Sequence, residues 1–315
     1  MGKSPVKVLQ HLIGNMYSKR SYHSNIYCKS HTTLAIFHYF QVMKRHYLLI
    51  LLLVATSFTR PSSFVAETPT PHDGWTSLFN GKDIKDWDVY LKGIGLNPAS
   101  QQVFTVTTED NQKCIRVSGE ITGGLSTKKE YGDYHLQLLF KWGSATWGSK
   151  KGKKKDSGLL YHSVGAYGAD GGAWMRSQEF QVEETNTGDY WGCAGATADI
   201  PAVKKDTDYV YNPDGTLYTF RADTRTGRHC IKAGDNENPT GQWNTLDLYC
   251  HGDTAVHVVN GKTVMILYHC AQADNGQLTP LTKGKIQLQS EGAEIFYKQI
   301  RVQPIKSLPA EILSK

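Results

Sequence analysis

The chain has 315 residues, with 35 Lys and Arg against 29 Asp and Glu, and a formal net charge of +6. Eight of the cations and none of the acids precede residue 67, so residues 67–315 hold 27 cations against 29 acids. A charge near −2 on this larger part argues against the broad basic surface of a nucleic-acid-binding protein, and we expect no nucleic-acid partner.

The first 66 residues have the pattern of a targeting segment. Met43, Lys44 and Arg45 precede the apolar run LLILLLVA, and small and polar residues follow up to Ala66. A charged start, a short apolar core and a small-residue exit predict a secretory signal peptide over residues 43–66, with a retained membrane anchor as the alternative. Residues 1–42 are then interpreted as an upstream extension of the gene model. We expect a secreted or periplasmic protein with no membrane association beyond the export signal.

The cysteines do not predict a disulfide framework. Five follow the leader, and an odd number in an exported chain leaves at least one free thiol. None has the CxxC spacing of a zinc knuckle. The cysteines after the leader are Cys114, Cys193, Cys230, Cys250 and Cys270. A divalent cation is left open as a cofactor because Glu, Asp and His are available, but no ligand spacing identifies a metal site.

After a Pro-rich linker at residues 67–73, a single domain is predicted over residues 74–304, followed by a tail at 305–315. Short alternating apolar and polar runs are separated by Gly, Asn and Asp, and no segment has a helical stripe of helical length. This pattern predicts an all-β jelly-roll β-sandwich. The predicted strands are Val103–Thr107, Cys114–Ser118, Tyr134–Trp142, Ser157–Ser163, Tyr218–Ala222, Trp243–Cys250, Ala255–Val259, Thr263–Tyr268, Lys285–Glu291 and Glu294–Val302.

Two connections between predicted strands have distinctive sequences. The charge run Lys150–Lys155, KKGKKK, is interpreted as a solvated loop tip rather than a ligand clamp. The pair Asn260-Gly261 predicts a type I′ hairpin turn. Counting pairs outward from the turns at both ends of its strand places His257 opposite Val264 and Leu248, so we expect His257 to pack in the core.

The stretch RSQEFQVEETNTGDYW, from Arg176 to Trp191, begins with the alternation of a β-strand. Apolar Phe and Val alternate with Glu179, Gln181 and Glu183, which gives one apolar face and one face of carboxylates and amides. An acidic face that is merely exposed to solvent is the alternative interpretation.

A second predicted strand, KIQLQSE, has the same alternation of an apolar face and a polar face. Gln287, Gln289 and Glu291 share one face of it, while the apolar residues share the other. If the two strands belong to one sheet, their polar faces form a floor of donors and acceptors that suits the hydroxyls of a sugar.

Glu179 and Glu291 are the principal candidates for acid or base. Glu179 and Glu183 lie four residues apart, roughly 13 Å along a strand, so a partner carboxyl must come from another strand unless the chain bulges. Glu291 is the first candidate partner and Asp189 the second. The other candidates are Glu183 and His162 for catalysis, Gln181, Gln289 and Lys141 for polar contacts to the substrate, and Trp142, Trp174 and Trp191 for stacking on a sugar. His162 and Lys141 also have structural interpretations, as a satisfied strand histidine and as a surface lysine.

Six stretches in order resemble the family named 3-keto-disaccharide hydrolase, and the resemblance covers Gly74 to Val302. It implies a concanavalin A-like β-sandwich, secreted by bacteria, that acts on oxidised disaccharides or glycosides. Leu139 stands where many members have an acid, which puts a role for an acid there in doubt. The stretches are GWTSLFNGKDIKDW at Gly74, EYGDYHLQLLFKWG at Glu130, SGLLYH at Ser157, RSQEFQVEETNTGDYW at Arg176, WNTLDLYCHGD with HVVNG from Trp243, and GKIQLQSEGAEIFYKQI at Gly284.

The resemblance implies a specific chemistry. A ketone at C3 acidifies the hydrogen on C2, so a base removes that proton, the C1 oxygen is expelled, and water adds back. This needs a base near C2, a donor or cation at the C3 oxygen, for which Lys141 is the candidate, and an acid for the leaving group. We therefore expect an enzyme that cleaves 3-keto-disaccharides or 3-keto-glucosides. The alternatives are a conventional endo-glucanase and a carbohydrate-binding module without catalysis. The sugar, linkage and oligomeric state are left open.

Overall fold

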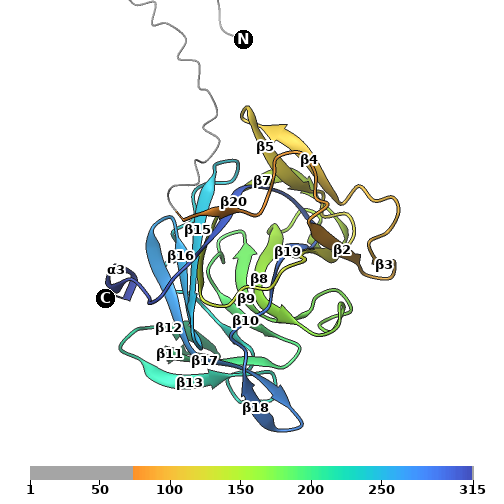
Figure 1. Ribbon diagram of the computed structural model, residues 1–315. Helices are drawn as coiled ribbons and strands as arrows, with labels where there is room; N and C mark the ends of the chain where they lie inside the picture. The colour runs from red at the N-terminus through yellow and green to blue at the C-terminus, as the bar shows by residue number, and fades with distance from the viewer. Residues whose placement is uncertain (1–73, 314–315) are drawn as a thin grey trace, which may run out of the picture. The chain divides into compact units, whose positions relative to one another are not determined.

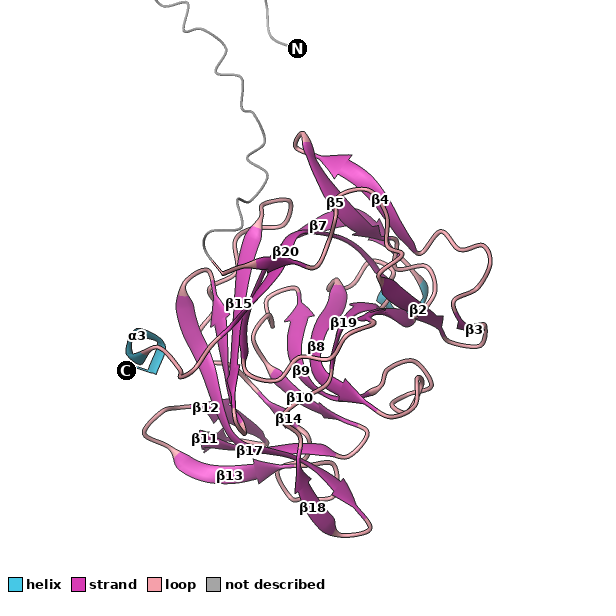
Figure 2. Cartoon of the chain, viewed as in Figure 1, coloured by secondary structure: helices cyan, strands magenta, loops and turns pink. Residues whose placement is uncertain are grey.

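The structure, a computed structural model, describes residues 74–313. The predicted leader and linker lie outside these residues. The described chain forms two antiparallel β-sheets with almost no helix (Figures 1 and 2), which confirms the predicted all-β sandwich. Within residues 74–313, the helices are too short and too polar to cross a bilayer.

The larger sheet has twelve strands. They are β1 (Thr76–Ser77), β4 (Phe104–Glu109), β5 (Gln112–Val117), β7 (Tyr134–Thr146), β11 (Ala196–Lys205), β12 (Asp208–Tyr211), β13 (Thr216–Phe220), β15 (Asn244–His251), β16 (Thr254–Val259), β17 (Lys262–Asp274), β18 (Gln277–Pro280) and β20 (Ala293–Pro304). Their order is β12-β11-β17-β16-β15-β7-β20-β5-β4, while β1, β13 and β18 pair outside this path.

The smaller sheet has eight strands and carries the two polar strands predicted from the sequence. They are β2 (Trp87–Leu91), β3 (Gly95–Leu96), β6 (Gly123–Thr127), β8 (Asp156–Val164), β9 (Arg176–Glu183), β10 (Tyr190–Cys193), β14 (His229–Cys230) and β19 (Lys285–Ser290). Their order is β14-β10-β9-β8-β19-β6-β2-β3, so β8 lies between the two polar strands β9 and β19. The helical segments are a 3₁₀ turn at Gly148–Lys150 and α3 at Ala310–Leu313.

Each stretch predicted as a strand overlaps an observed strand, but β11 has only a weak pattern in the sequence. Ala198, Ile200 and Ala202 of this strand are buried, yet two of them are alanines, and Pro201 lies between the last two. The strand is nevertheless paired with β12, β13 and β17. Pairing on both sides therefore overrides a weak local signal.

The core lies between the two sheets. From the smaller sheet, Leu159, Phe180 and Leu288 are buried in it, together with residues such as Leu138 and Leu248 of the larger sheet. The five cysteines within residues 74–313 are all buried and free, so the described fold is held by apolar packing and strand pairing without a disulfide. Strand side chains alternate between the two faces of a sheet. The residues that directly precede and follow Leu159, Phe180 or Leu288 therefore face the opposite side of the smaller sheet.

His257 confirms one expectation and corrects another. It is fully buried, stacks on Phe180 with ring centroids 4.1 Å apart, and pairs with Leu248 as predicted. On its other side it pairs with Met265 rather than Val264, so that part of the predicted register is wrong. The Asn260-Gly261 turn has positive φ at both residues, as a type I′ turn requires. A bulge beyond the turn adds one residue to β17 and moves the register by one.

A matched pair of leucines tests this description of the core. Leu288 is 0% exposed and Leu278 is 51% exposed. Leu288→Ala should lower the free energy of unfolding by about 2–5 kcal/mol because it removes buried apolar volume and leaves a cavity. Leu278→Ala should change it by less than about 0.5 kcal/mol. Urea denaturation measures both values, and equal losses would contradict the assignment of β19 to the core.

Candidate active site

Three neighbouring strands of the smaller sheet turn their polar side chains away from the core. In the register of β8 with β9, Asp156 pairs with Glu183, Gly158 with Gln181, and Leu160 with Glu179. On the other side of β8, Leu160 also pairs with Gln287 of β19. The face predicted from two strands is thus assembled around a third strand between them.

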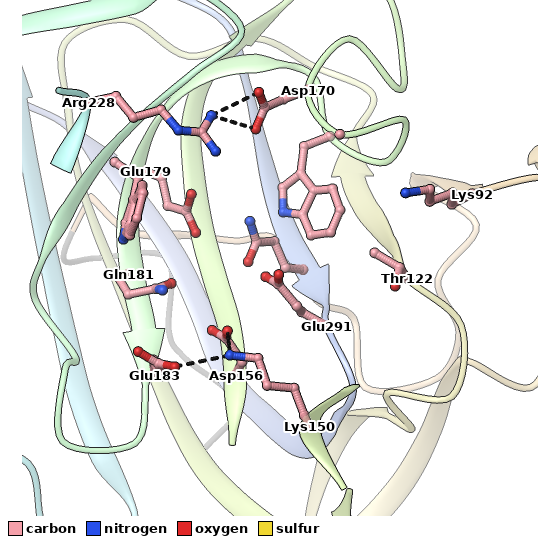
Figure 3. A pocket seen from close by; sticks show the side chains of 14 residues that line it. Lys92, Thr122, Lys150, Asp156, Asp170, Glu179, Gln181, Glu183, Arg228 and Glu291 are labelled. Atoms are coloured by element: carbon pink, nitrogen blue, oxygen red, sulfur yellow. Dashed lines mark hydrogen bonds and ion pairs between the residues drawn. The ribbon is translucent and has the colours of Figure 1, made fainter. Parts of the chain in front are cut away.

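A pocket of about 470 Å³ lies over this face, a volume in the range of small-molecule sites. Glu179, Gln181 and Glu183 follow one another along β9 at its floor, and Glu291 reaches in from the turn that follows β19 (Figure 3). The acids of separate segments therefore meet in one cavity, although Glu291 lies just beyond the strand that was predicted to carry it.

Glu179 is only 6% exposed although its carboxyl belongs to the pocket lining. Its Oε2 accepts a hydrogen bond from Cys193 Sγ at 3.3 Å. The space for this side chain comes from Gly158 on the adjacent strand. A Cβ at Gly158 would lie 2.5 Å from Gln289 Oε1 and closer still to Glu179 Oε1, so both side chains occupy the room that a larger residue would fill.

The surroundings of Glu179 favour its protonated form. Burial raises the pKa of Glu179 to about 8, and the nearby acid Asp156 acts in the same direction. Hydrogen bonds from Cys193 and Gln289 and the charge of Arg228 oppose this rise, since they stabilise the carboxylate. A carboxyl whose pKa lies near neutral pH is suited to exchange protons with a substrate.

One end of the pocket is a compact set of charges. Lys150 Nζ forms ion pairs with Asp156 and, at 3.1 Å, with Glu183 Oε1 (Figure 3). Burial raises the pKa of Asp156, which Lys150 opposes. Burial also raises the pKa of Glu291, and the neighbouring acids Asp156 and Glu179 add to it. These surroundings favour the neutral form of Glu291, and Lys150 partly opposes them.

The other end is formed by Arg228 and two aromatic side chains. Arg228 Nη1 donates to Asp170 Oδ1 at 2.9 Å and to Oδ2 at 3.0 Å. Trp191 lies beneath the guanidinium, with the Arg228 Cζ 5.4 Å from the ring centroid. Trp174, from the loop between β8 and β9, also lines the pocket.

Most of the predicted site residues lie in this pocket. Those that line it are Glu179, Glu183, Glu291, Gln181, Gln289, Trp174 and Trp191. The predicted sugar floor and both of its principal acids are therefore brought together, and their chemical roles stay predictions.

Two predicted catalytic residues lie elsewhere. His162 is buried at a bulge of β8 with φ of 50°, and its Nδ1 contacts the carbonyl of Leu281 at 3.0 Å. Burial lowers the pKa of His162 to about 4, so it is a neutral structural histidine. Asp189 is buried and accepts hydrogen bonds from the Lys232 amide at 3.0 Å and from His229 Nε2 at 2.9 Å. Neither side chain lines the pocket.

Lys141 and Trp142 belong to β7 in the larger sheet and do not line the pocket either. Lys141 pairs with Glu109 and with Asp110, the latter at 2.8 Å. Trp142 is buried, and its Nε1 donates a hydrogen bond to Glu237 Oε1 at 2.8 Å. Leu139 lies on the same strand, opposite Thr245. The cation expected at a ketone oxygen must therefore come from another residue.

Sequence reasoning missed about half of the lining. The missed residues are Lys92, Thr122, Lys150, Asp156, Asp170, Gly171 and Arg228. Asp156 had a usable signal, because it precedes the strand SGLLYHS by one residue and alternates with Gly158. Lys150 belongs to the charge run interpreted as a solvated tip, and that interpretation is wrong for this residue, which ion-pairs in the pocket. Arg228 follows a segment with no clear pattern, so only the fold places it here.

No cluster of three or more His, Cys, Asp or Glu within residues 74–313 has an arrangement able to hold a metal ion. The divalent cation left open from the sequence stays a prediction without an assigned position.

Comparison with known families decides what kind of protein this is. The model of the 3-keto-alpha-glucoside-1,2-lyase-like domain matches residues 74–303. The chain belongs to this family. Membership in the 3-keto-alpha-glucoside-1,2-lyase-like family confirms the resemblance found in the sequence and makes the chain a carbohydrate-active protein of the glycosyl hydrolase or lyase-like type. No curated protein matches it significantly.

Several solved structures are similar to this family member. A candidate glycosyl hydrolase from Parabacteroides distasonis is 17% identical, with 74% of this chain and 94% of that chain covered and a TM-score of 0.43. A carbohydrate-binding module from Bacillus subtilis is 9% identical, with 69% and 95% covered and a TM-score of 0.37. Domain 4 of an extracellular arabinanase from Geobacillus stearothermophilus, in complex with arabinotriose, is 12% identical, with 72% and 85% covered and a TM-score of 0.38.

The role of Gly158 as the gap in the floor is testable. Gly158→Ala places a methyl group against Glu179 and Gln289, so the free energy of unfolding should fall by about 1–3 kcal/mol, as in other overpacked sites. Gly132→Ala is the matched control, because the nearest atom to its new Cβ would be 3.6 Å away. Chemical denaturation compares the two variants. Equal stability of the Gly158→Ala and Gly132→Ala proteins would contradict the claim that Glu179 and Gln289 fill the space above Gly158.

Proposed function

We propose that this chain cleaves 3-keto-disaccharides or 3-keto-glucosides in the pocket over the smaller sheet. The observation that carries the proposal is the meeting of the buried Glu179 and the half-buried Glu291, two carboxyls from separate segments, in one cavity. Family membership supports a carbohydrate substrate. A 3-keto sugar is favoured because its cleavage needs two proton transfers, which two carboxyls with raised pKa values are suited to perform.

In the proposed reaction, Glu179 is the base that removes the proton from C2. The electron pair of the C2–H bond forms an enolate with the C3 ketone. As the ketone is restored, a double bond forms between C1 and C2, the C1–O bond breaks, and Glu291 donates its proton to the departing oxygen. Water then adds across the double bond and releases the 3-keto sugar.

The assignment of the two roles follows from their surroundings. The carboxylate form of Glu179 is stabilised by Cys193, Gln289 and Arg228, which work against its burial. Asp156 and Glu179 add to the effect of burial in raising the pKa of Glu291, and Lys150 opposes them. Groups whose surroundings differ in this way separate into a base and an acid. Glu179 therefore loses its proton first, and Glu291 keeps its own for the leaving group.

The remaining lining supports binding of a sugar. Trp174 offers apolar ring surface to a sugar, while the ring of Trp191 is covered by Arg228 and His229. Gln181 and Gln289 carry amides that both donate and accept hydrogen bonds, as sugar hydroxyls require. The export signal predicted at residues 43–66 would place this activity outside the cytoplasm, in secreted or periplasmic form.

The central test is direct cleavage of 3-keto-trehalose or a 3-keto-glucoside by the purified chain. Glu179→Gln and Glu291→Gln should each reduce kcat/KM by about 100-fold or more, because each removes one proton transfer. Glu130→Gln, at an exposed residue, is the matched control and should retain activity. Release of sugar from untreated β-glucan would instead favour a conventional endo-glucanase, and binding without cleavage would favour a carbohydrate-binding module.

The pH dependence of the same reaction gives an independent check. The base must be ionised, so kcat/KM should rise with pH up to about 8, where Glu179 loses its proton. The acid must be protonated, so activity should fall again at more alkaline pH as Glu291 loses its proton. A pH–rate profile with an optimum near pH 5 would contradict these assignments, since Glu179 is then protonated.

A further inference from the structure

Arg228 reaches the pocket from an edge of the smaller sheet. It directly precedes β14, where His229 pairs with Trp191 of β10. The carbonyl of Arg228 accepts a hydrogen bond from the Gly192 amide at 2.9 Å. This pairing fixes the backbone at the rim and lets the guanidinium extend over Trp191, with Cζ 5.4 Å from the ring centroid.

The guanidinium uses only part of its hydrogen-bonding capacity. Its Nη1 contacts both oxygens of Asp170 and, at 3.5 Å, the carbonyl of Gly192. Its Nε and Nη2 make no hydrogen bond to any residue between 74 and 313, although the side chain lines the pocket. Lys150, by contrast, is held by two carboxylates at the opposite end. Arg228 thus keeps an N–H edge available to a ligand oxygen.

The order of groups along the pocket matches the order of the reacting atoms. Figure 3 shows the carboxyl of Glu179 between the guanidinium of Arg228 and the carboxyl of Glu291. Burial raises the pKa of Glu179, and the charge of Arg228 acts against that rise, as expected for close neighbours. In a 3-keto sugar the C3 oxygen, the C2 hydrogen and the C1 oxygen also follow one another along the ring.

We propose that Arg228 is a catalytic residue that binds the C3 oxygen of the substrate and stabilises the enolate formed when C2 loses its proton to Glu179. This inference rests on the proposed function. The C2–H electron pair moves into the C2–C3 bond, and the carbonyl π pair moves onto the C3 oxygen. The N–H edge of Arg228 stabilises the negative charge on that oxygen by hydrogen bonding. Arg228 therefore takes the role that the sequence assigned to Lys141.

Two neighbours hold the guanidinium in place for this role. Asp170 anchors Nη1 from the loop between β8 and β9, which leaves the other edge directed to the ligand. Trp191 supports the flat face, and it is itself stacked on His229 with ring centroids 4.2 Å apart. A donor held before the reaction begins stabilises developing charge without reorganisation, which makes its contribution to catalysis large.

Exchange of the C2 hydrogen separates this step from cleavage of the glycosidic bond. The probe is 1,5-anhydro-3-keto-glucitol, which has the ketone and the C2 hydrogen but no leaving group, incubated in D₂O and followed by NMR. We expect Arg225→Gln to keep the wild-type exchange rate and Arg228→Gln to lose about 100- to 1000-fold, as for removal of an oxyanion donor. Arg228→Lys should lie between them, since it retains the charge without the planar N–H edge.

Arg225→Gln is the matched control, because Arg225 is an exposed arginine on the same loop. Thermal unfolding establishes that each variant is folded, and Arg228→Lys serves if Arg228→Gln is not. If the wild-type chain neither cleaves 3-keto-trehalose nor exchanges the probe, the proposed function itself fails. If it does both and folded Arg228→Gln and Arg228→Lys exchange within threefold of wild type, only the role of Arg228 is overturned.

Discussion

The site depends on a missing side chain. Gly158 lies on β8 between the two strands that carry Glu179 and Gln289, and both side chains lean into the space above it. Any Cβ at this position would meet their oxygens, so the carboxyl and the amide could not converge over the sheet. Strand side chains on one face otherwise stand in rows, separated from each other by the spacing of the sheet. The gap converts a row of polar residues into a floor with a concave centre.

The charges of the pocket are arranged at its two ends. Lys150 offsets Asp156 and Glu183 at one end, while Arg228 is paired with Asp170 alone at the other. Glu179 and Glu291 lie between these ends, where burial makes ionisation costly. The result is an arrangement in which acids with raised pKa values are held beside fixed cations. Such a combination suits the proton transfer and charge stabilisation that the proposed reaction needs.

The sequence predicted the sandwich and the central acids because both follow from alternation. Phe180 with Val182, and Ile286 with Leu288, define inward faces, and the opposite faces then carry the glutamates and glutamines. Asp189 and Trp142 could not be placed in this way, because they lie beyond the alternating runs or in the other sheet. His162 belongs to a strand of the correct sheet, but a bulge changes its direction, and Lys141 belongs to β7. Arg228 directly precedes the short edge strand β14, whose partner is fixed only by tertiary pairing.

The same features support the proposal that the substrate is an oxidised sugar. Conventional hydrolysis with retention requires an ionised carboxylate to attack C1, with a second carboxyl as the acid. Burial raises the pKa of both Glu179 and Glu291, so near neutral pH the ionised carboxylate that either reaction needs is the minor form. A 3-keto sugar can be deprotonated by a weaker base, because the ketone acidifies the C2 hydrogen and its oxygen carries the negative charge of the enolate. A carboxyl with a raised pKa is also the stronger base once ionised, which suits removal of the C2 proton.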